Sequence, residues 1–439
     1  MKNYLNSLIE LRSTTFSYQL FQIIRFSTLV IISILLVKLK FTPAETSYYE
    51  NFLFLINLST FFWVAGIGNA LLSWYPRLTE ENKAVFFQNT FTLLQIAGIC
   101  VGILLYIFKG FGILNDTRNT IILVSLYVIF YAPTIITELY YLLTEKRKYL
   151  IYYGIFIYTL QLCLGFTAAI IYNDIYYVLL FLLIWVFIRW IWTIVVVFSI
   201  KNLINTYKFS INKGFVLYSM PIIIHLLFSN GSEFVDGILV DKFFNADQFS
   251  IYRYGAREFP LILVLIGAVR TSMIPLAVKD IKNALISVKR ITGRLMHVFY
   301  PIAVILVFSS KFLYEFFYDS DYNYSALLFN IYLLTLSSRI ILSEIFIYAS
   351  GLNKVFVFVS FFEIVLNIIL SLILMKFFGL AGIATGTFIA FFVSKVFLVS
   401  YVSSKLGTKL NEYLNLKIYF GYNAILFFAF IISLFLFFG

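Results

Sequence analysis

The sequence predicts an all-α, polytopic membrane protein, and three observations support this fold class. Apolar residues make up 62% of the 439-residue chain and charged residues only 12%, whereas soluble domains average about 45–50% and about 25%. Apolar runs of about 20 residues recur along the chain, and each is long enough to cross a hydrocarbon core of about 30 Å. Stretches such as residues 176–187 lack the polar–apolar alternation of a transmembrane β-barrel.

Thirteen membrane spans are predicted from these apolar runs. The first twelve form the body of the protein, and the last is an extra C-terminal transmembrane helix. The connections between spans are too short to hold a soluble domain. The predicted spans cover residues 20–41, 50–75, 84–108, 119–143, 149–172, 175–200, 215–240, 250–278, 296–318, 325–350, 354–378, 380–403 and 417–438.

The distribution of basic residues predicts the orientation in the membrane. Alternate connections carry most of the lysines and arginines, as in Lys146, Arg147 and Lys148, and the intervening connections carry few. Basic loops stay on the cytoplasmic side, so we expect a cytoplasmic N-terminus and a cell inner (cytoplasmic) membrane location, without a cleaved signal peptide. The net charge of +12 then reflects topology and contact with anionic membrane lipids, and nucleic acid is not expected as a partner.

An internal repeat relates the two halves of the chain. Residues 138–166 match residues 344–372 without a gap, 206 positions later. Six spans separate the two copies, so both copies have the same orientation, as in the parallel repeats of transporters. We therefore predict two six-helix halves around a central cavity, residues 1–200 and 215–403, with a linker at 201–214 and the extra helix in 404–439. The repeat pairs Glu138 with Glu344, Lys148 with Lys354, and Gln161 with Asn367.

Two passages resemble a known family. Residues 353–391, with the stretches LNIILSLILM and FGLAGIATGT, resemble the eleventh and twelfth spans of Wzx-type polysaccharide flippases. Residues 233–259 resemble the passage from that family's seventh span to its eighth, where Asp236 takes the place of an acidic residue ahead of DQFSIYRYG. This family shares a superfamily, the multidrug/oligosaccharidyl-lipid/polysaccharide exporters, with MATE drug exporters and lipid II flippases. Members usually have twelve or fourteen spans, so thirteen is a departure.

The resemblance implies a flippase rather than an enzyme. Such a protein translocates polyprenyl-diphosphate-linked oligosaccharide repeat units across the cytoplasmic membrane by alternating access, for surface polysaccharides such as the O-antigen of lipopolysaccharide. Its partners would be the lipid-linked oligosaccharide, membrane lipids, and a polysaccharide polymerase with its chain-length regulator.

Arginines within the spans are the candidate substrate-binding residues. Arg253 and Arg257 are four residues apart, which places them on one face of a helix, and Arg270 follows deeper in the same predicted span. Arg25 lies in the first span, which the repeat relates to the seventh. Guanidinium groups suit a diphosphate because they bind phosphate oxygens in pairs. The alternative is structural: Arg253 and Arg257 would pair with the nearby Glu233, Asp236 or Glu258.

Glu233, Asp236 and His225 on the seventh span are candidates for a coupling ion or proton, because ionisable residues are rare inside a bilayer. The alternatives are ion pairs with arginines of the eighth span and a packing role for His225. We expect Glu138 and Glu344 to contact the basic turns that follow them.

Several function classes lack their motifs. The sequence contains no G-x-x-x-x-G-K-[ST] phosphate loop, no metal-ligand spacing, and no H-E-x-x-H or G-x-S-x-G motif. We therefore expect no catalytic residues, no cofactor and no metal. Two alternatives stay open: a membrane-embedded polysaccharide polymerase or lipid-linked glycosyltransferase, and a drug/cation antiporter of the same superfamily. Short external connections argue against the enzyme, and the basic eighth span argues against the antiporter.

Overall fold

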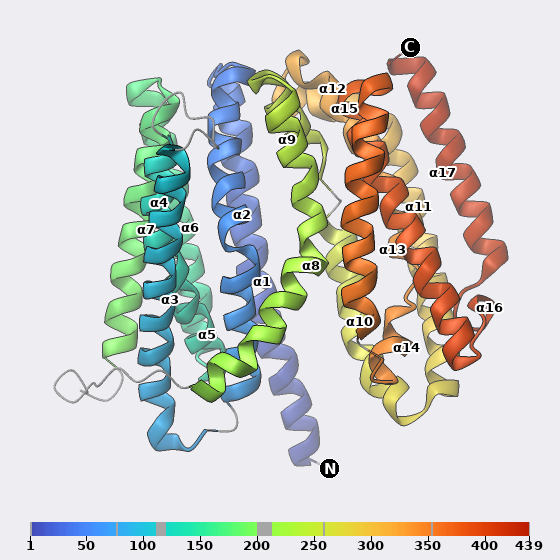
Figure 1. The fold of residues 1–439 in the computed structure, drawn as a ribbon, viewed down its shortest axis with the longest axis horizontal. Coiled ribbons are helices and arrows are strands. Elements are labelled where there is room, and N and C mark those ends of the chain that lie inside the picture. The colour runs from blue at the N-terminus through green and yellow to red at the C-terminus, as the bar shows by residue number, and fades with distance from the viewer. Residues whose placement is uncertain are drawn as a thin grey trace. The chain divides into compact units, whose positions relative to one another are not determined.

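The computed structural model describes residues 2–75, 78–110, 120–199, 213–257, 260–352 and 354–438, and every element in these ranges is helical. The chain divides into two compact units, unit 1 (residues 1–227) and unit 2 (residues 228–439). Figure 1 traces both from the blue N-terminus to the red C-terminus. The predicted all-α membrane fold with two halves is confirmed. The predicted limits of the halves and linker stay predictions.

In unit 1 the long helices run side by side (Figure 1), with α1 against α6, α3 against α4, and α7 against both α4 and α6. Buried aromatic side chains, among them Phe21, Tyr153 and Trp185, fill the space between α1, α6 and α7. The elements are α1 (Lys2–Lys38), α2 (Pro43–Trp74), α3 (Glu80–Gly110), α4 (Thr120–Tyr131), the 3₁₀ helix η2 (Ala132–Thr134), α5 (Ile135–Leu143), α6 (Arg147–Tyr172) and α7 (Ile175–Phe198).

Unit 2 begins inside helix α8 (Lys213–Phe243), whose first half belongs to unit 1. Its core lies around α11, which contacts α10, α12 and α17. The remaining elements are α9 (Ala246–Gly255), α10 (Pro260–Lys279), α11 (Ile281–Tyr318), the 3₁₀ helix η4 (Ser320–Tyr322), α12 (Asn323–Leu333), α13 (Leu336–Arg339), α14 (Glu344–Ala349), α15 (Lys354–Leu406), α16 (Leu410–Tyr413) and α17 (Leu416–Phe437).

Nine helical segments in the described ranges are long and apolar enough to cross a membrane, so the chain is a multi-pass membrane protein. One of the nine is the 53-residue α15, which holds two predicted spans. Gly379, with φ of 57°, interrupts α15 between the spans predicted at 354–378 and 380–403. Only glycine adopts this conformation at little cost, so the chain reverses there.

The predicted eighth span differs from the structure. It was expected as one helix over residues 250–278, but α9 ends at Gly255 and α10 begins at Pro260. Proline has no N–H to donate, so it is tolerated in the first turn of a helix, and Pro260 stands at the start of α10. Arg257 therefore lies beyond the end of α9, and it does not share a helix face with Arg253. Instead, the Nε of Arg257 donates to the carbonyl oxygen of Arg253 at 2.8 Å.

The fourth and tenth spans are both broken, and the breaks follow the repeat. In unit 1 the 3₁₀ helix η2 separates α4 from α5. In unit 2 a non-helical stretch around residues 341–342 separates α13 from α14. Helix α5 ends at Leu143 and α14 ends at Ala349, 206 positions apart. The repeat inferred from sequence therefore extends to the shape of the backbone.

Gly382 permits the close approach of the two arms of α15, which gives a test of the fold. A Cβ there would lie 2.3 Å from the carbonyl oxygen of Leu374, so the backbone must shift. We expect Gly382→Ala to destabilise the protein by about 1–3 kcal/mol, as overpacking does. Thermal unfolding in detergent measures this. The matched control is Gly421→Ala on α17, where a Cβ meets nothing within 4 Å. Equal melting temperatures for the two variants would contradict the proposed close packing.

Candidate functional site

A buried ion pair joins the broken fourth span of unit 1 to the sixth span. The carboxylate of Glu138 on α5 pairs with the Nη2 of Arg189 on α7, and their side chains are 4% and 2% exposed. The Nε of Arg189 donates to the hydroxyl of Tyr153 at 3.0 Å. The guanidinium also lies 5.6 Å from the ring centroid of Trp185. A buried charge is tolerated only when it is paired and hydrogen-bonded, and Arg189 meets both conditions.

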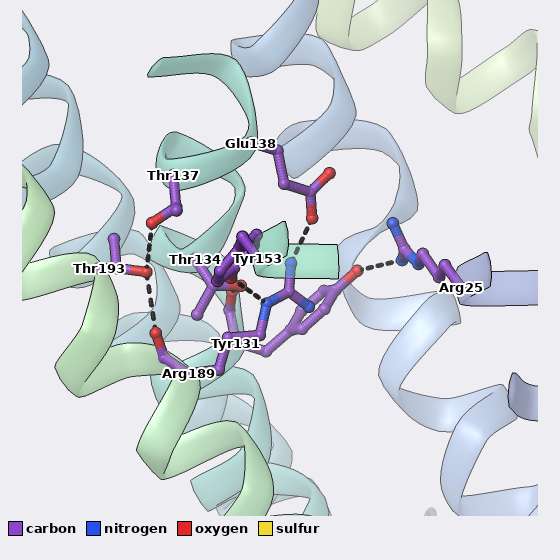
Figure 2. Close-up of polar contacts among 8 residues, drawn as sticks. All are labelled: Arg25, Tyr131, Thr134, Thr137, Glu138, Tyr153, Arg189 and Thr193. Carbon is purple, nitrogen blue, oxygen red and sulfur yellow. Dashed lines mark hydrogen bonds and ion pairs between the residues drawn. The ribbon is translucent and has the colours of Figure 1, made fainter. Parts of the chain in front are cut away.

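Threonine hydroxyls make hydrogen bonds at the same break, between α4 and α5. The Thr137 hydroxyl donates to that of Thr193 at 2.8 Å, and Thr193 donates to the backbone carbonyl of Arg189 at 3.0 Å. The Thr134 hydroxyl donates to the carbonyl of Tyr131 at 2.7 Å. Figure 2 shows these contacts around the Glu138–Arg189 pair. A helix break inside a membrane must satisfy its backbone groups within the protein, and the threonines contribute to this.

Arg25 on α1 reaches the same region from the opposite side. Its Nη2 donates to the hydroxyl of Tyr131 at 2.8 Å. The ring of Tyr131 lies 5.9 Å from the guanidinium of Arg189, so this tyrosine stands between two arginines (Figure 2). An aromatic face attracts a cation, which lets two positive groups approach the same side chain.

These side chains line a cavity of about 50 Å³ inside unit 1. One water needs only about 10–15 Å³ of such space. In the described part of the chain, the Tyr158 hydroxyl and Gln161 Oε1 are buried without a hydrogen-bond partner, and both residues line the cavity. Two arginines border the cavity, and the carboxylate near it is that of Glu138, which pairs with Arg189. Its lining consists of Arg25, Leu29, Leu53, Ile56, Asn57, Tyr127, Tyr131, Tyr158, Gln161, Trp185 and Arg189.

Unit 2 contains an equivalent ion pair. The Nζ of Lys395 on α15 pairs with the carboxylate of Glu344, the first residue of α14. Lys395 also donates to the carbonyl of Ile341 at 3.1 Å, which lies in the break before α14. Lys395 stands 206 positions after Arg189, as Glu344 does after Glu138. The expectation that both glutamates contact the following basic turns is wrong, because their partners lie 51 residues further along the chain.

A second buried carboxylate in unit 2 belongs to Asp236 on α8, which is 3% exposed. Tyr252 and Tyr332 donate their hydroxyls to Oδ2 at 2.8 and 2.5 Å. The Nδ2 of Asn367 donates to Oδ1 at 3.2 Å, and the Thr387 hydroxyl lies within 2.7 Å of both oxygens. These partners are hydroxyls and an amide from three other helices. The structure therefore does not support an ion pair between Asp236 and the described arginines of α9 and α10.

The predicted arginines fall into separate surroundings. Arg25 lines the cavity of unit 1. Arg253 and Arg257 lie at and beyond the end of α9, where the Arg257 guanidinium is 5.5 Å from the ring centroid of Tyr254. Arg270 lies on α10 and interacts electrostatically with Glu344. The predicted coupling candidates His225 and Glu233, and Glu258 beside the arginines, have side chains outside the described part of the structure.

The sequence reasoning did not identify the roles of Arg189 and Lys395. A signal was available: the 206-residue offset that pairs Glu138 with Glu344 also pairs these two cations. Applying the repeat to charged residues, as well as to apolar ones, would have found the ion pairs. The contributions of Tyr131 and Tyr158 carry no such signal, because tyrosine is frequent throughout the chain.

Comparisons with known proteins place the fold. No protein family and no curated relative matches the sequence. Among solved structures, the lipid II flippase MurJ in an inward closed conformation is 19% identical with a TM-score of 0.68, over 97% of this chain and 95% of that one. An inward-facing MATE multidrug resistance transporter of the MOP superfamily is 14% identical with a TM-score of 0.62, over 88% and 98%. The eukaryotic MATE transporter AtDTX14 is 12% identical with a TM-score of 0.59, over 95% and 99%.

The chain therefore has the fold of MOP-superfamily membrane transporters. The three structures are those of a lipid II flippase and two MATE transporters, so flippases and multidrug transporters share this fold.

The ion pair of unit 1 gives a testable prediction. Removing one partner of a buried pair leaves an unpaired charge and costs about 3–5 kcal/mol, so we expect Arg189→Met to lower stability by this amount. Adding Glu138→Gln to the same chain removes the orphaned charge. The double variant should then be more stable than Arg189→Met alone, as measured by thermal unfolding in detergent. Additive losses from the two substitutions would argue against the pair.

Proposed function

We propose that the protein is a flippase for polyprenyl-diphosphate-linked oligosaccharide repeat units. It would move them from the inner to the outer leaflet of the cytoplasmic membrane by alternating access, for assembly of a surface polysaccharide such as the O-antigen of lipopolysaccharide. The observation that carries this proposal is the cavity of unit 1, which two arginines line inside a transporter fold. The resemblance of residues 353–391 to Wzx-type flippases supplies the substrate class.

The chemistry of the cavity suits a phosphate group. Arg25 uses one N–H to donate to the Tyr131 hydroxyl, and a guanidinium has five N–H donors, so donors remain for a ligand. The Tyr158 hydroxyl can donate another. The head group would therefore bind here through phosphate, while the lipid tail stays in the bilayer.

Arg253, Arg257 and Arg270 are proposed as further contacts along the path of the head group. The absence of a phosphate-loop motif favours an ion gradient over ATP as the energy source. A cytoplasmic N-terminus and partnership with a polysaccharide polymerase and chain-length regulator belong to the same proposal.

Asp236 is proposed to hold a coupling ion, with Glu233 and His225 as further candidates on α8. The Thr387 hydroxyl oxygen lies next to its carboxylate, and Asn367 Oδ1 lies 3.2 Å from that hydroxyl, so oxygen atoms, which hard cations prefer as ligands, are close to Asp236. The Asp236 carboxylate, which accepts from four hydrogen-bond donors, can also bind a proton. Either a metal cation or a proton therefore suits this site.

A drug/cation antiporter is the second candidate, because two of the similar structures described above are MATE transporters. Cationic drugs need an acidic cavity, but the cavity of unit 1 is lined by two arginines and no carboxylate. The polymerase or glycosyltransferase alternative receives no support from the described residues, which hold no group of three potential metal ligands and whose fold is that of transporters.

Substitution of Arg25 tests the flippase proposal. Loss of a charge-assisted hydrogen bond costs about 1.5–3 kcal/mol, so we expect Arg25→Gln to slow flipping roughly 10- to 100-fold. The assay follows a fluorescent polyprenyl-diphosphate oligosaccharide in proteoliposomes, with a membrane-impermeant quencher reporting the leaflet. The control is Lys354→Gln, which removes an exposed charge. A wild-type protein that flips the lipid while Arg25→Gln flips it equally fast would remove Arg25 from the site.

The role of Asp236 is tested by imposed gradients. We expect Asp236→Asn to flip at a rate that no longer responds to a sodium or proton gradient, because the amide cannot carry the negative charge. Thr387→Ser is the control, since it keeps the hydroxyl that Asp236 accepts from. A gradient response in Asp236→Asn that equals that of the wild type would move the coupling ion elsewhere.

A further inference from the structure

The two units contain the same ion pair with different chemistry. Glu138–Arg189 and Glu344–Lys395 occupy equivalent positions of the repeat, 206 residues apart, and each glutamate follows a break in its span. The cation comes from α7 in unit 1 and from the second arm of α15 in unit 2. The remaining difference is the cation itself: arginine in unit 1 and lysine in unit 2.

This difference decides whether the pair can exchange a proton. A guanidinium does not lose its proton in proteins, so Glu138–Arg189 remains a charged pair. A lysine ammonium loses its proton readily when it is buried or lies near other cations. The side chain of Lys395 is only 10% exposed.

Burial of the Lys395 side chain favours release of its proton, and the paired Glu344 opposes release. Two arginines from neighbouring elements, Arg270 on α10 and Arg339 on α13, both act electrostatically against its positive charge. Glu344 is the acidic group that faces it, and Tyr348 and Tyr413 are the other titratable groups around this glutamate.

A replacement partner for Glu344 is already in place. Its Oε1 binds Lys395, whereas its Oε2 is buried without a hydrogen-bond partner in the described part of the chain. Arg270 comes from α10, which packs directly against α14. The structure gives Arg270 no hydrogen bond or ion pair to any residue that it describes. Arg270 thus has N–H donors available among the described residues. The nearby Glu344 Oε2 has no hydrogen-bond partner among them.

We propose that Lys395 is a proton-carrying site within the membrane. In the protonated state its ammonium pairs with Glu344. In the other state one N–H bond breaks, the proton passes to water, and the neutral amine keeps the electron pair. Glu344 remains charged and is then held by Arg270 through Oε2. The Glu138–Arg189 pair of unit 1 stays charged in both states and serves as the fixed counterpart.

The contact with the Ile341 carbonyl links this exchange to the backbone. Lys395 donates to that carbonyl inside the break of the tenth span. Loss of the proton removes the positive charge from this contact and frees Glu344 to turn toward α10. The first helical turn of α14 begins at Glu344, so the change of partner acts on the start of this helix. Coupling of the exchange to transport rests on the proposed flippase function, but the proton site itself does not.

The first experiment compares proton release without any substrate. Lys395→Arg reproduces the pair found in unit 1 and cannot release its proton. Potentiometric difference titration of the purified full chain in detergent should show that the wild type releases about one proton per chain, below the pH range in which exposed lysines titrate, that Lys395→Arg retains. The control is Lys311→Arg on α11, where the lysine is partly buried and binds the carbonyl of Phe437. This control should release as many protons as the wild type.

Equal proton release by the wild type and Lys395→Arg, with both chains folded by thermal unfolding, overturns the proposal. Lys395→Met, which mimics the neutral amine in charge, covers the case in which arginine does not fit. It should likewise lack the released proton.

The second experiment uses the proteoliposome flipping assay with an imposed pH gradient. The wild type and Lys311→Arg should respond to the gradient, and Lys395→Arg should respond at least tenfold less. A gradient response in Lys395→Arg equal to that of the wild type overturns the link between this proton and transport. Absence of flipping in the wild type overturns the proposed flippase function instead, and it leaves the outcome of the titration standing.

Discussion

The buried carboxylate–cation pair in each unit is the interaction on which the surrounding structure depends. A charge inside a membrane protein is costly unless a partner neutralises it, and Glu138 and Glu344 sit within the bundles. Each lies where its span is broken, and each binds a cation from a later helix, Arg189 of α7 or Lys395 of α15. The pair therefore fixes two things together: how the broken span packs, and which face of the sixth or twelfth span points inward.

The ion pair of unit 1 also supplies part of the lining of the cavity, because Arg189 borders it. Arg189 spends Nε and Nη2 on Tyr153 and Glu138, and its planar group lies near the rings of Trp185 and Tyr131. Arg25 completes the arrangement from α1 through the hydroxyl of Tyr131. These aromatic side chains contact both guanidinium groups, so two positive charges line the cavity. Such a cavity suits an anionic head group and does not suit a cationic drug.

Unit 2 contains the equivalent ion pair, but its cation is a lysine where unit 1 has an arginine. Its lysine can lose a proton, and its second carboxylate, Asp236, is surrounded by hydroxyls and an amide. The proposed flippase, if an ion gradient drives it, needs a group that changes charge between its states. The repeat thus gives one unit an arginine in its ion pair and the other unit a lysine, and we propose that this difference separates substrate binding from ion coupling.

The sequence by itself determined the class of the protein and indicated the repeat, but its predicted eighth span was wrong because α9 ends at Gly255. Apolar composition and span length decide the class, because in lipid every backbone polar group must be bonded within the segment, so only helices of sufficient length cross. It also indicated that Arg25 and Asp236 matter, since charges inside spans need a reason. Only the tertiary structure decided their partners. Whether Arg257 continues a helix depends on the chain before Pro260, and whether Glu138 meets Lys148 or Arg189 depends on how the broken span turns. Those choices rest on packing between helices that lie far apart in the sequence, for which residue type and spacing along one chain carry little information.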